Sequence, residues 1–254
     1  MQSPPFCWMS NRMILTTNNG WQIKRLVSAN LLSLILLLSW LLEPSRGLWL
    51  ALDEQIFWAM NRSLHWGEGW QRFWAIANNR VFDLVAAIAM TLLFAHQALL
   101  RDRERIKHYV ALGAFMFITL LLMLLISKNL PIERPSATAQ FTDAVRLSQL
   151  VPDIPTKDYS SDSFPGDHGL VLLLSAGFAL AYLPKIHGLL ALVLMVLFTL
   201  PRLMSGAHWL TDEIVGALSL GLVTLSWLFA TPLHRAILDW FEQKTRRLFE
   251  LLGR

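Results

Sequence analysis

The chain has 254 residues, of which 54% are hydrophobic and 16% are charged, whereas a soluble domain carries about a quarter charged residues. Its single cysteine, Cys7, excludes an intrachain disulfide and a cysteine-based metal site. The net charge of +4 alone would suit a nucleic-acid partner, but the placement of that charge excludes this class and indicates a membrane protein.

Six apolar blocks approach the roughly 20 residues that a helix needs to cross a bilayer. The alternative, a large buried helical core, does not suit so many long blocks in one small chain. The sequence therefore predicts an all-α integral membrane protein with six transmembrane helices. Its predicted parts are an N-terminal extension (1–22), a membrane domain (23–231) and a C-terminal helix (232–254). The predicted spans are 26–42, 81–100, 108–127, 168–184, 187–203 and 212–230.

The distribution of charge predicts the orientation. Six spans place both termini on one side of the membrane, together with the loops at 101–107 and 184–186. That side carries thirteen Lys and Arg against five Asp and Glu, for +8, and the other side has a net charge of −4. Because positive charge marks the cytoplasmic side, both termini are expected in the cytoplasm and the long loops in the periplasm.

Three further segments have recognisable patterns. The tryptophan-rich loop 43–80 predicts an amphipathic helix in the outer interface, which either anchors the protein there or forms a lid or wall over a site. The loop 129–167 is polar and rich in proline, with a short helix expected around 138–150. The stretch 232–252 is typical of a basic amphipathic helix on the anionic inner leaflet.

Three groups of ionisable residues gather at the outer ends of the predicted spans, where such residues are costly unless they serve a site. The first group follows the third span, the second opens the fourth, and the third connects the fifth to the sixth. A compact bundle brings these helix ends together. The groups are Lys128, Arg134 and Pro135, then 163–168, then Arg202, His208 and Asp212.

These residue types suit phosphoryl transfer. His208 and Asp212 are four residues apart, so the carboxylate can fix the imidazole tautomer that leaves the other nitrogen free to attack. His168, at a helix N-terminus, can protonate a leaving oxygen, and the backbone N–H groups beside it can bind an anion. Each feature alone has a plainer explanation, but their order, side and spacing together indicate a site. Phosphate oxygens would be held by three cations, Lys128, Arg134 and Arg202.

The pattern resembles the type 2 phosphatidic acid phosphatase (PAP2) superfamily, whose signature is Lys-x6-Arg-Pro, Pro-Ser-Gly-His and Ser-Arg-x5-His-x3-Asp. The third motif matches at 202–212, with Pro201 in place of the serine. The resemblance implies a six-helix membrane bundle that needs no metal and no cofactor. The implied roles are nucleophile for His208, its orienting partner for Asp212, general acid for His168, and phosphate binding for Arg202, Arg134, Lys128 and the backbone at Gly166.

The sequence departs from this signature in two places. Lys128 precedes Arg134 by five intervening residues instead of six, which shifts its helical phase by about 100°. The second motif reads Pro165-Gly166-Asp167-His168, so a serine hydroxyl is lost and a carboxylate is gained beside an anionic substrate. We expect Asp167 to pair with one of the cations or with an amine or hydroxyl of the acceptor.

The altered second motif, with the stretches 78–83, 156–169 and 201–209, is similar to the bacterial lipid A 1-diphosphate synthases. The resemblance implies two lipid substrates in the inner membrane: undecaprenyl diphosphate gives its distal phosphate to the 1-phosphate of lipid A at the periplasmic face. The residues at 78–83 and 156–162 are candidates for recognising the head group of the acceptor, and capping and loop hydrogen bonds explain them equally well. The candidates for substrate recognition are Asp167, Asn79, Arg80 and Ser163.

Two alternatives remain at this point. The first is a phosphatase that acts on undecaprenyl diphosphate or another lipid phosphate, with the same residues and water as the acceptor. The second is a lipid-binding or transport protein that uses a cationic pocket without chemistry, against which the spacing of two histidines and an aspartate argues.

Overall fold

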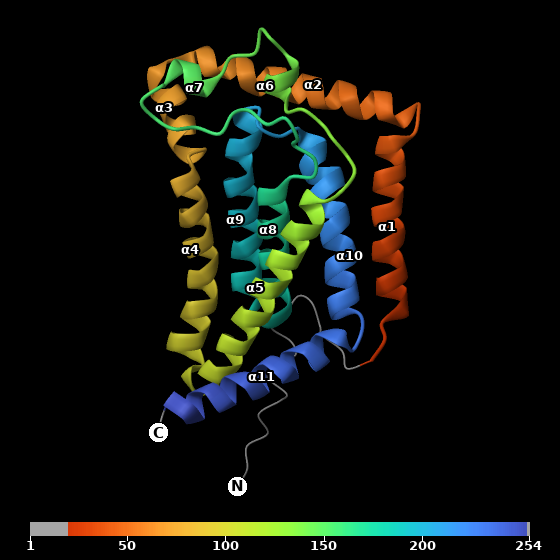
Figure 1. Ribbon diagram of the computed structural model, residues 1–254, viewed down its shortest axis with the longest axis vertical. Coiled ribbons are helices and arrows are strands. Elements are labelled where there is room, and N and C mark those ends of the chain that lie inside the picture. The colour runs from red at the N-terminus through yellow and green to blue at the C-terminus, as the bar shows by residue number, and fades with distance from the viewer. Residues whose placement is uncertain (1–19, 253–254) are drawn as a thin grey trace.

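The computed structural model describes residues 20–252, which form helices and loops without a strand. Residues 1–19 of the predicted extension (1–22) lie outside the described residues. Upright helices form a bundle, α2 and α3 cross one end of it, and α11 crosses the other (Figure 1). The α-helices are α1 (Ile23–Leu41), α2 (Ser45–Ser63), α3 (Glu68–Ala77), α4 (Arg80–His96), α5 (Ile106–Lys128), α6 (Ala137–Gln140), α7 (Leu147–Leu150), α8 (Asp167–Tyr182), α9 (Lys185–Met204), α10 (Leu218–Phe229) and α11 (Leu233–Leu252).

Five helical segments of the described chain are long and apolar enough to cross a membrane. They coincide with five of the six predicted blocks. The sides of these helices that face away from the bundle carry exposed apolar side chains, as contact with lipid requires. The protein is therefore a multi-pass membrane protein. The segments are Ile23–Leu41, Arg80–Arg101, Arg103–Lys128, Lys185–Met204 and Asp212–Phe229, three of which include short turns of π- or 3₁₀-helix.

α8 corresponds to the predicted fourth span over 168–184, but it is short for a membrane crossing. It has 16 residues and rises about 24 Å, less than the hydrocarbon core of roughly 30 Å. It lies in the middle of the bundle against α5, α9 and α10, and Leu170, Leu174 and Phe178 on it are fully buried. The surroundings of α8 are therefore largely protein, and by length and composition the described chain has five candidate spans.

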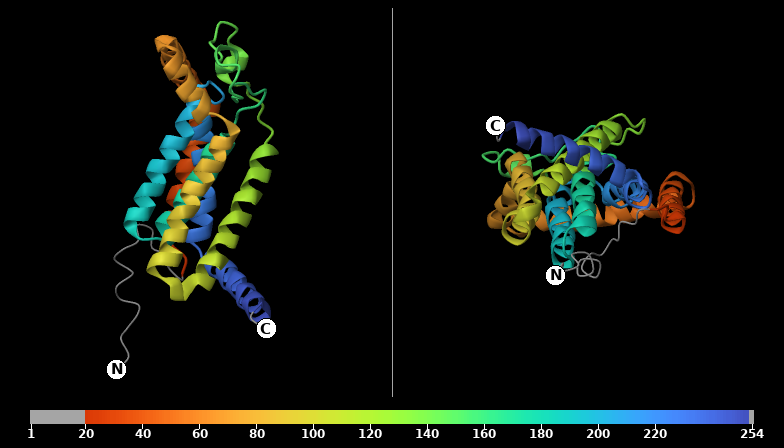
Figure 2. Two further views of the ribbon diagram at one scale, coloured as in Figure 1. Left: turned by 90° about the vertical axis from the view of Figure 1, so that its left-hand side faces the viewer. Right: turned by 90° about the horizontal axis from the view of Figure 1, so that it is seen from below.

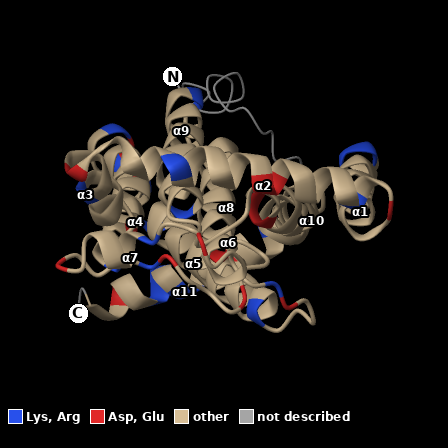
Figure 3. Cartoon of the chain, turned by 90° about the horizontal axis from the view of Figure 1, so that it is seen from above, with Lys and Arg blue, Asp and Glu red and all other residues tan. Residues whose placement is uncertain are grey.

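The tryptophan-rich segment forms two helices, α2 and α3, rather than one. Gly67 separates them with a backbone φ of 130°, which residues that carry a side chain rarely adopt. Seen from above, charged residues lie along α2, α3 and the loops at this end of the bundle (Figure 3). α2 turns Asp53, Phe57 and Asn61 inward, one helical turn apart, so two polar side chains of this helix are buried against the outer end of the bundle.

The loop 129–167 packs beneath α2. In place of the helix predicted around 138–150, it has two single turns, α6 and α7. Asn61 fastens it, because its side chain donates to the carbonyl of Val145 (2.7 Å) and accepts from the N–H of Val145 (3.0 Å). At the other end of the molecule, α11 lies across the bundle near the loop between α4 and α5 (Figure 2). His108 of α5 and Glu242 of α11 are 2.7 Å apart there.

Candidate active site

His208 lies in the sharp turn between α9 and the π-helical segment Asp212–Ala217. Gly206 makes this turn possible with φ of 72°. The Nδ1 atom of His208 is 2.9 Å from the carbonyl oxygen of Ser163, and that oxygen can only accept. Nδ1 therefore carries the hydrogen, and Nε2 keeps its lone pair. Nε2 is buried and has no hydrogen-bond partner within residues 20–252. A buried imidazole nitrogen in this state is suited to nucleophilic attack.

Carboxylates surround the His208 ring. Its burial lowers the pKa, but the hydrogen bond to Asp212 and the negative charges of Glu213, Asp212 and Asp167 together raise the pKa of His208 above its ordinary value of 6.5. Asp212 Oδ2 lies 3.4 Å from Nδ1, and Asp167 Oδ1 lies 3.8 Å from Nε2. The carboxylate of Asp167 thus faces Nε2 of His208.

Arg134 lies on the side of Asp212, away from Nε2 of His208. One terminal nitrogen of its guanidinium group donates to Asp212 Oδ1 (2.8 Å), and the other donates to Asp53 Oδ2 (2.6 Å). Its central carbon lies 4.9 Å from the centre of the Trp209 ring. Arg134 is thus buried and engaged by two carboxylates, and it is not among the residues that line the cavity described next. Its contacts position Asp212.

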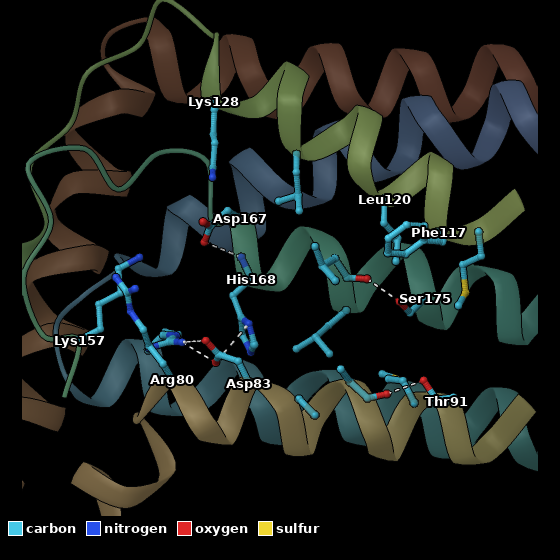
Figure 4. A pocket seen from close by; sticks show the side chains of 18 residues that line it. Arg80, Asp83, Thr91, Phe117, Leu120, Lys128, Lys157, Asp167, His168 and Ser175 are labelled. Carbon is cyan, nitrogen blue, oxygen red and sulfur yellow. Dashed lines mark hydrogen bonds and ion pairs between the residues drawn. The ribbon is translucent and has the colours of Figure 1, made fainter. Parts of the chain in front are cut away.

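A cavity of about 740 Å³ opens beside His168, between α4, α5 and α8 (Figure 4). One end is polar and charged, and the other is lined by apolar side chains such as Phe117, Leu120 and Leu172. A phosphate attached to a long apolar chain has this distribution of charge. The polar end is formed by Arg80, Asp83, Lys128, Lys157, Asp167, His168 and Arg202.

The cations at the polar end are of two kinds. Arg202 is paired, because one terminal nitrogen lies 2.5 and 2.7 Å from the two oxygens of Asp83 and the other donates to Asn78 Oδ1 (2.7 Å). The side-chain nitrogens of three others make no hydrogen bond and no ion pair with a described residue. These are Arg80, Lys128 and Lys157, and they are the groups available to an anion.

His168, at the first turn of α8, lines the cavity where the general acid is predicted. Its Nδ1 lies 3.7 Å from Asp83 Oδ1, so Asp83 contacts both a histidine and an arginine of the site. The N–H of His168 donates to Asp167 Oδ1 (2.7 Å). Asp167 was expected to pair with one of the three predicted cations, but none of them lies at ion-pair distance from it among the described residues. Its charged neighbour is His208 instead.

Gly166 stands where the superfamily signature has serine, and the structure gives a reason. A Cβ atom at this position would lie 2.3 Å from the carboxylate of Glu213, which follows Asp212 directly. The N–H of Gly166 donates to the carbonyl of Asp212 (3.0 Å), so it is not directed to a substrate. Glu213 fills the space of the missing serine, and its Oε1 is buried without a hydrogen-bond partner among residues 20–252.

The other predicted recognition residues have different surroundings. Ser163 is buried, orients His208 through its carbonyl, and donates its hydroxyl to the carbonyl of Arg134 (3.2 Å). Asn79 caps α4 by accepting from Val81 and also donates to the carbonyl of Pro155 (2.7 Å). Arg80 lines the cavity, as a recognition residue would.

Two residues of the site, Asp53 and Glu213, escaped the sequence analysis. Asp83 and Lys157 lie in the stretches 78–83 and 156–162, which were singled out without a role for either side chain. A signal existed for Glu213, because it is a carboxylate within an apolar span, where a charge is costly unless it is paired.

Comparisons with known proteins agree with this geometry. The PAP2 superfamily profile matches residues 108–236, which include α5, His168, Arg202, His208 and Asp212. The chain is 37% identical over 222 residues to the lipid A 1-diphosphate synthase of Escherichia coli (strain K12), covering 87% of this chain and 93% of that protein. No solved structure matches the chain significantly. The chain belongs to the PAP2 superfamily and is a lipid phosphotransferase or phosphatase.

Proposed function

We propose that this enzyme transfers the distal phosphate of undecaprenyl diphosphate to the 1-phosphate of lipid A, through a phosphohistidine at His208. The observation that carries the proposal is the unpartnered, buried Nε2 of His208. It lies 3.8 Å from Asp167, which lines a cavity with three available cations at one end and apolar walls at the other. The similarity to a lipid A 1-diphosphate synthase supports this choice of substrates.

The apolar part of the cavity suits the tail of the donor. It extends from the polar end along α4, α5 and α8 (Figure 4). A polyprenyl chain in this part would direct the diphosphate toward Lys128, His168 and Arg202 at the polar end. The proposal includes six membrane crossings with α8 counted among them, both termini in the cytoplasm and the site at the periplasmic face of the inner membrane, as the charge asymmetry predicts.

The first displacement forms the phosphoenzyme. Nε2 of His208 attacks the terminal phosphorus, so that an N–P bond forms and the bond from that phosphorus to the bridging oxygen breaks. Undecaprenyl phosphate leaves with the electron pair, and His168 donates a proton to it. Lys128, Arg80 and Lys157 balance the negative charge on the transferred group.

The second displacement discharges the phosphoenzyme. An oxygen of the 1-phosphate of lipid A attacks the same phosphorus, the N–P bond breaks, and its electron pair returns to Nε2. His168 now accepts any proton that the acceptor loses. Water in place of lipid A would give inorganic phosphate by the same route, which is the reaction of a lipid phosphate phosphatase.

Purified protein in detergent, supplied with undecaprenyl diphosphate labelled on its terminal phosphate, tests the proposal. With lipid A present, we expect label in lipid A diphosphate. The variant His208→Ala should lose this product, whereas His65→Ala, which removes an exposed histidine near the same end of the molecule, should keep it. Label released as inorganic phosphate alone, whether or not lipid A is present, would identify a phosphatase.

A further inference from the structure

A second, smaller cavity of about 340 Å³ adjoins the active-site cavity at the outer end of the bundle. It lies between the start of α4, the turn α7 and the loop 155–159. Arg80 and Lys157 line both cavities and therefore mark their junction. No step of the donor reaction needs this second cavity.

Most residues around the second cavity are polar or charged, and they carry an excess of positive charge. Arg80, Arg146 and Lys157 stand against one carboxylate, Asp158. That carboxylate is already engaged, because it accepts from the N–H of Ser148 (2.8 Å), from its hydroxyl (3.1 Å) and from Arg146 (3.2 Å). The remaining positive charge is available to an anionic ligand.

Arg146 has unused hydrogen-bonding capacity. Its Nε is buried and has no hydrogen-bond partner in the described part of the chain, although one terminal nitrogen reaches Asp158. Its guanidinium lies over the ring of Tyr159, 5.1 Å from the ring centre, while Tyr159 itself is 51% exposed. A flat aromatic surface beside a cation, with hydroxyl and amide groups around it, suits a ring-shaped polar ligand that carries an anion.

The cavity is held in a fixed position relative to the active site. Asn79 donates to the carbonyl of Pro155 (2.7 Å), and Asn78 donates to the carbonyl of Lys157 (2.6 Å). Asn78 also accepts from Arg202 of the active site (2.7 Å). Capping and loop hydrogen bonds at these residues therefore build the wall of the second cavity, and this preorganisation favours binding.

We propose that the second cavity binds the head group of the acceptor, a sugar that carries a phosphate. The sugar lies against Tyr159 and Arg146, and the phosphate lies between Arg80 and Lys157, where one of its oxygens meets the phosphoryl group carried by His208. This cavity suits a head group better than the donor tail, because four of its nine lining residues are charged and it is smaller than the active-site cavity. This inference rests on the proposed transferase function.

The test measures how the label divides between lipid A and inorganic phosphate as the concentration of lipid A is varied. For Arg146→Ala and for Tyr159→Ala, we expect the apparent KM for lipid A to rise about tenfold, and the ratio of transferred to released label to fall with it. This ratio compares two fates of one phosphoenzyme, so a partial loss of folded protein does not change it. Arg146→Lys, which keeps the charge, should recover part of the ratio.

The matched control is Arg62→Ala, which removes an exposed arginine of α2 near the same end of the molecule and should leave the ratio unchanged. If wild-type protein transfers label to lipid A, and both cavity variants keep the wild-type KM for lipid A, the head group binds elsewhere and the inference is wrong. If wild-type protein releases only inorganic phosphate, the proposed function fails and the inference fails with it. The two failures are distinguishable, because label reaches lipid A in the first case and never does in the second.

Discussion

Asp53 of α2 and Arg134 of the loop after α5 form a buried ion pair with a distance of 2.6 Å. Asp53 also accepts from the N–H of Thr211 (2.9 Å), next to Asp212. α2 is thereby fastened to the turn that carries His208. Of the two roles predicted for the tryptophan-rich segment, interface anchor or cover of the site, these contacts favour a fixed wall that does both.

The Asp53–Arg134 pair should matter for stability. Asp53→Ala leaves the guanidinium of Arg134 buried with one of its two carboxylate partners missing, and breaking a buried pair in this way costs about 3 to 5 kcal/mol. We expect a clear fall in the thermal unfolding temperature in detergent. Glu54→Ala, at the neighbouring exposed position, is the control. Equal unfolding temperatures for the two variants would show that the ion pair does not hold α2.

Lys128 should contribute directly to phosphate binding. It lines the polar end of the cavity without a partner among the described residues, despite its shifted spacing from Arg134. Lys128→Ala should lower kcat/KM for the donor about 10- to 100-fold, which corresponds to the loss of one or two charge-assisted hydrogen bonds. Lys128→Arg should recover part of it. Lys185→Ala, which removes an exposed lysine at the other end of the molecule, should leave kcat/KM for the donor unchanged. A similar fall in kcat/KM for Lys185→Ala would argue for a general effect of charge.

The pH dependence of the reaction should report His208. Because the pKa of His208 is raised above 6.5, the imidazole binds a proton at Nε2 as the pH falls through this pKa, and activity is lost on the acid side. Asp167→Asn removes one of the charges that raise this pKa, so the acid limb of the kcat/KM profile should move to lower pH. The donor ionises identically in both measurements, so it does not contribute to the difference. An acid limb that stays in place, or that moves to higher pH, would contradict the placement of Asp167 beside His208.

Gly166 and Glu213 should be energetically coupled. Gly166→Ser restores the residue of the superfamily signature but places Cβ 2.3 Å from the Glu213 carboxylate, which must then shift. We expect this variant to lose activity about tenfold or more. Adding Glu213→Ala makes room, so the double variant should be more active than Gly166→Ser alone, a non-additive result. Additive losses would mean that the two side chains do not compete for one space.

Much of the site was predictable because it depends on spacing along the chain. The positions of His208 and Asp212 four residues apart, and of His168 at the start of a helix, were sufficient to propose their roles. The arginines show what this reasoning did not reach. Arg134 and Arg202 were predicted as phosphate ligands, and their pairing with Asp53 and Asp83, which lie 81 and 119 residues away, was not predicted. Such pairings depend on how the helices pack, which local patterns do not encode.

The fold shows the same division. Five apolar segments were recognisable from composition and length, since contact with lipid requires a continuous apolar surface. α8, with 16 residues, nearly matches its predicted block over 168–184, but its burial by neighbouring helices was not predicted. The inward face of α2 was also unexpected, because Asp53 and Asn61 are buried by partners from other segments.

The central claim is that the phosphate passes through His208, and trapping the phosphoenzyme tests it most directly. Protein is mixed with donor labelled on its terminal phosphate, quenched within milliseconds or separated from the donor, and then offered lipid A. We predict label on His208, with the acid lability of a phosphohistidine, and its transfer to lipid A in the second step. Label that never appears on the protein, or that His208→Ala still transfers to lipid A, would contradict the account.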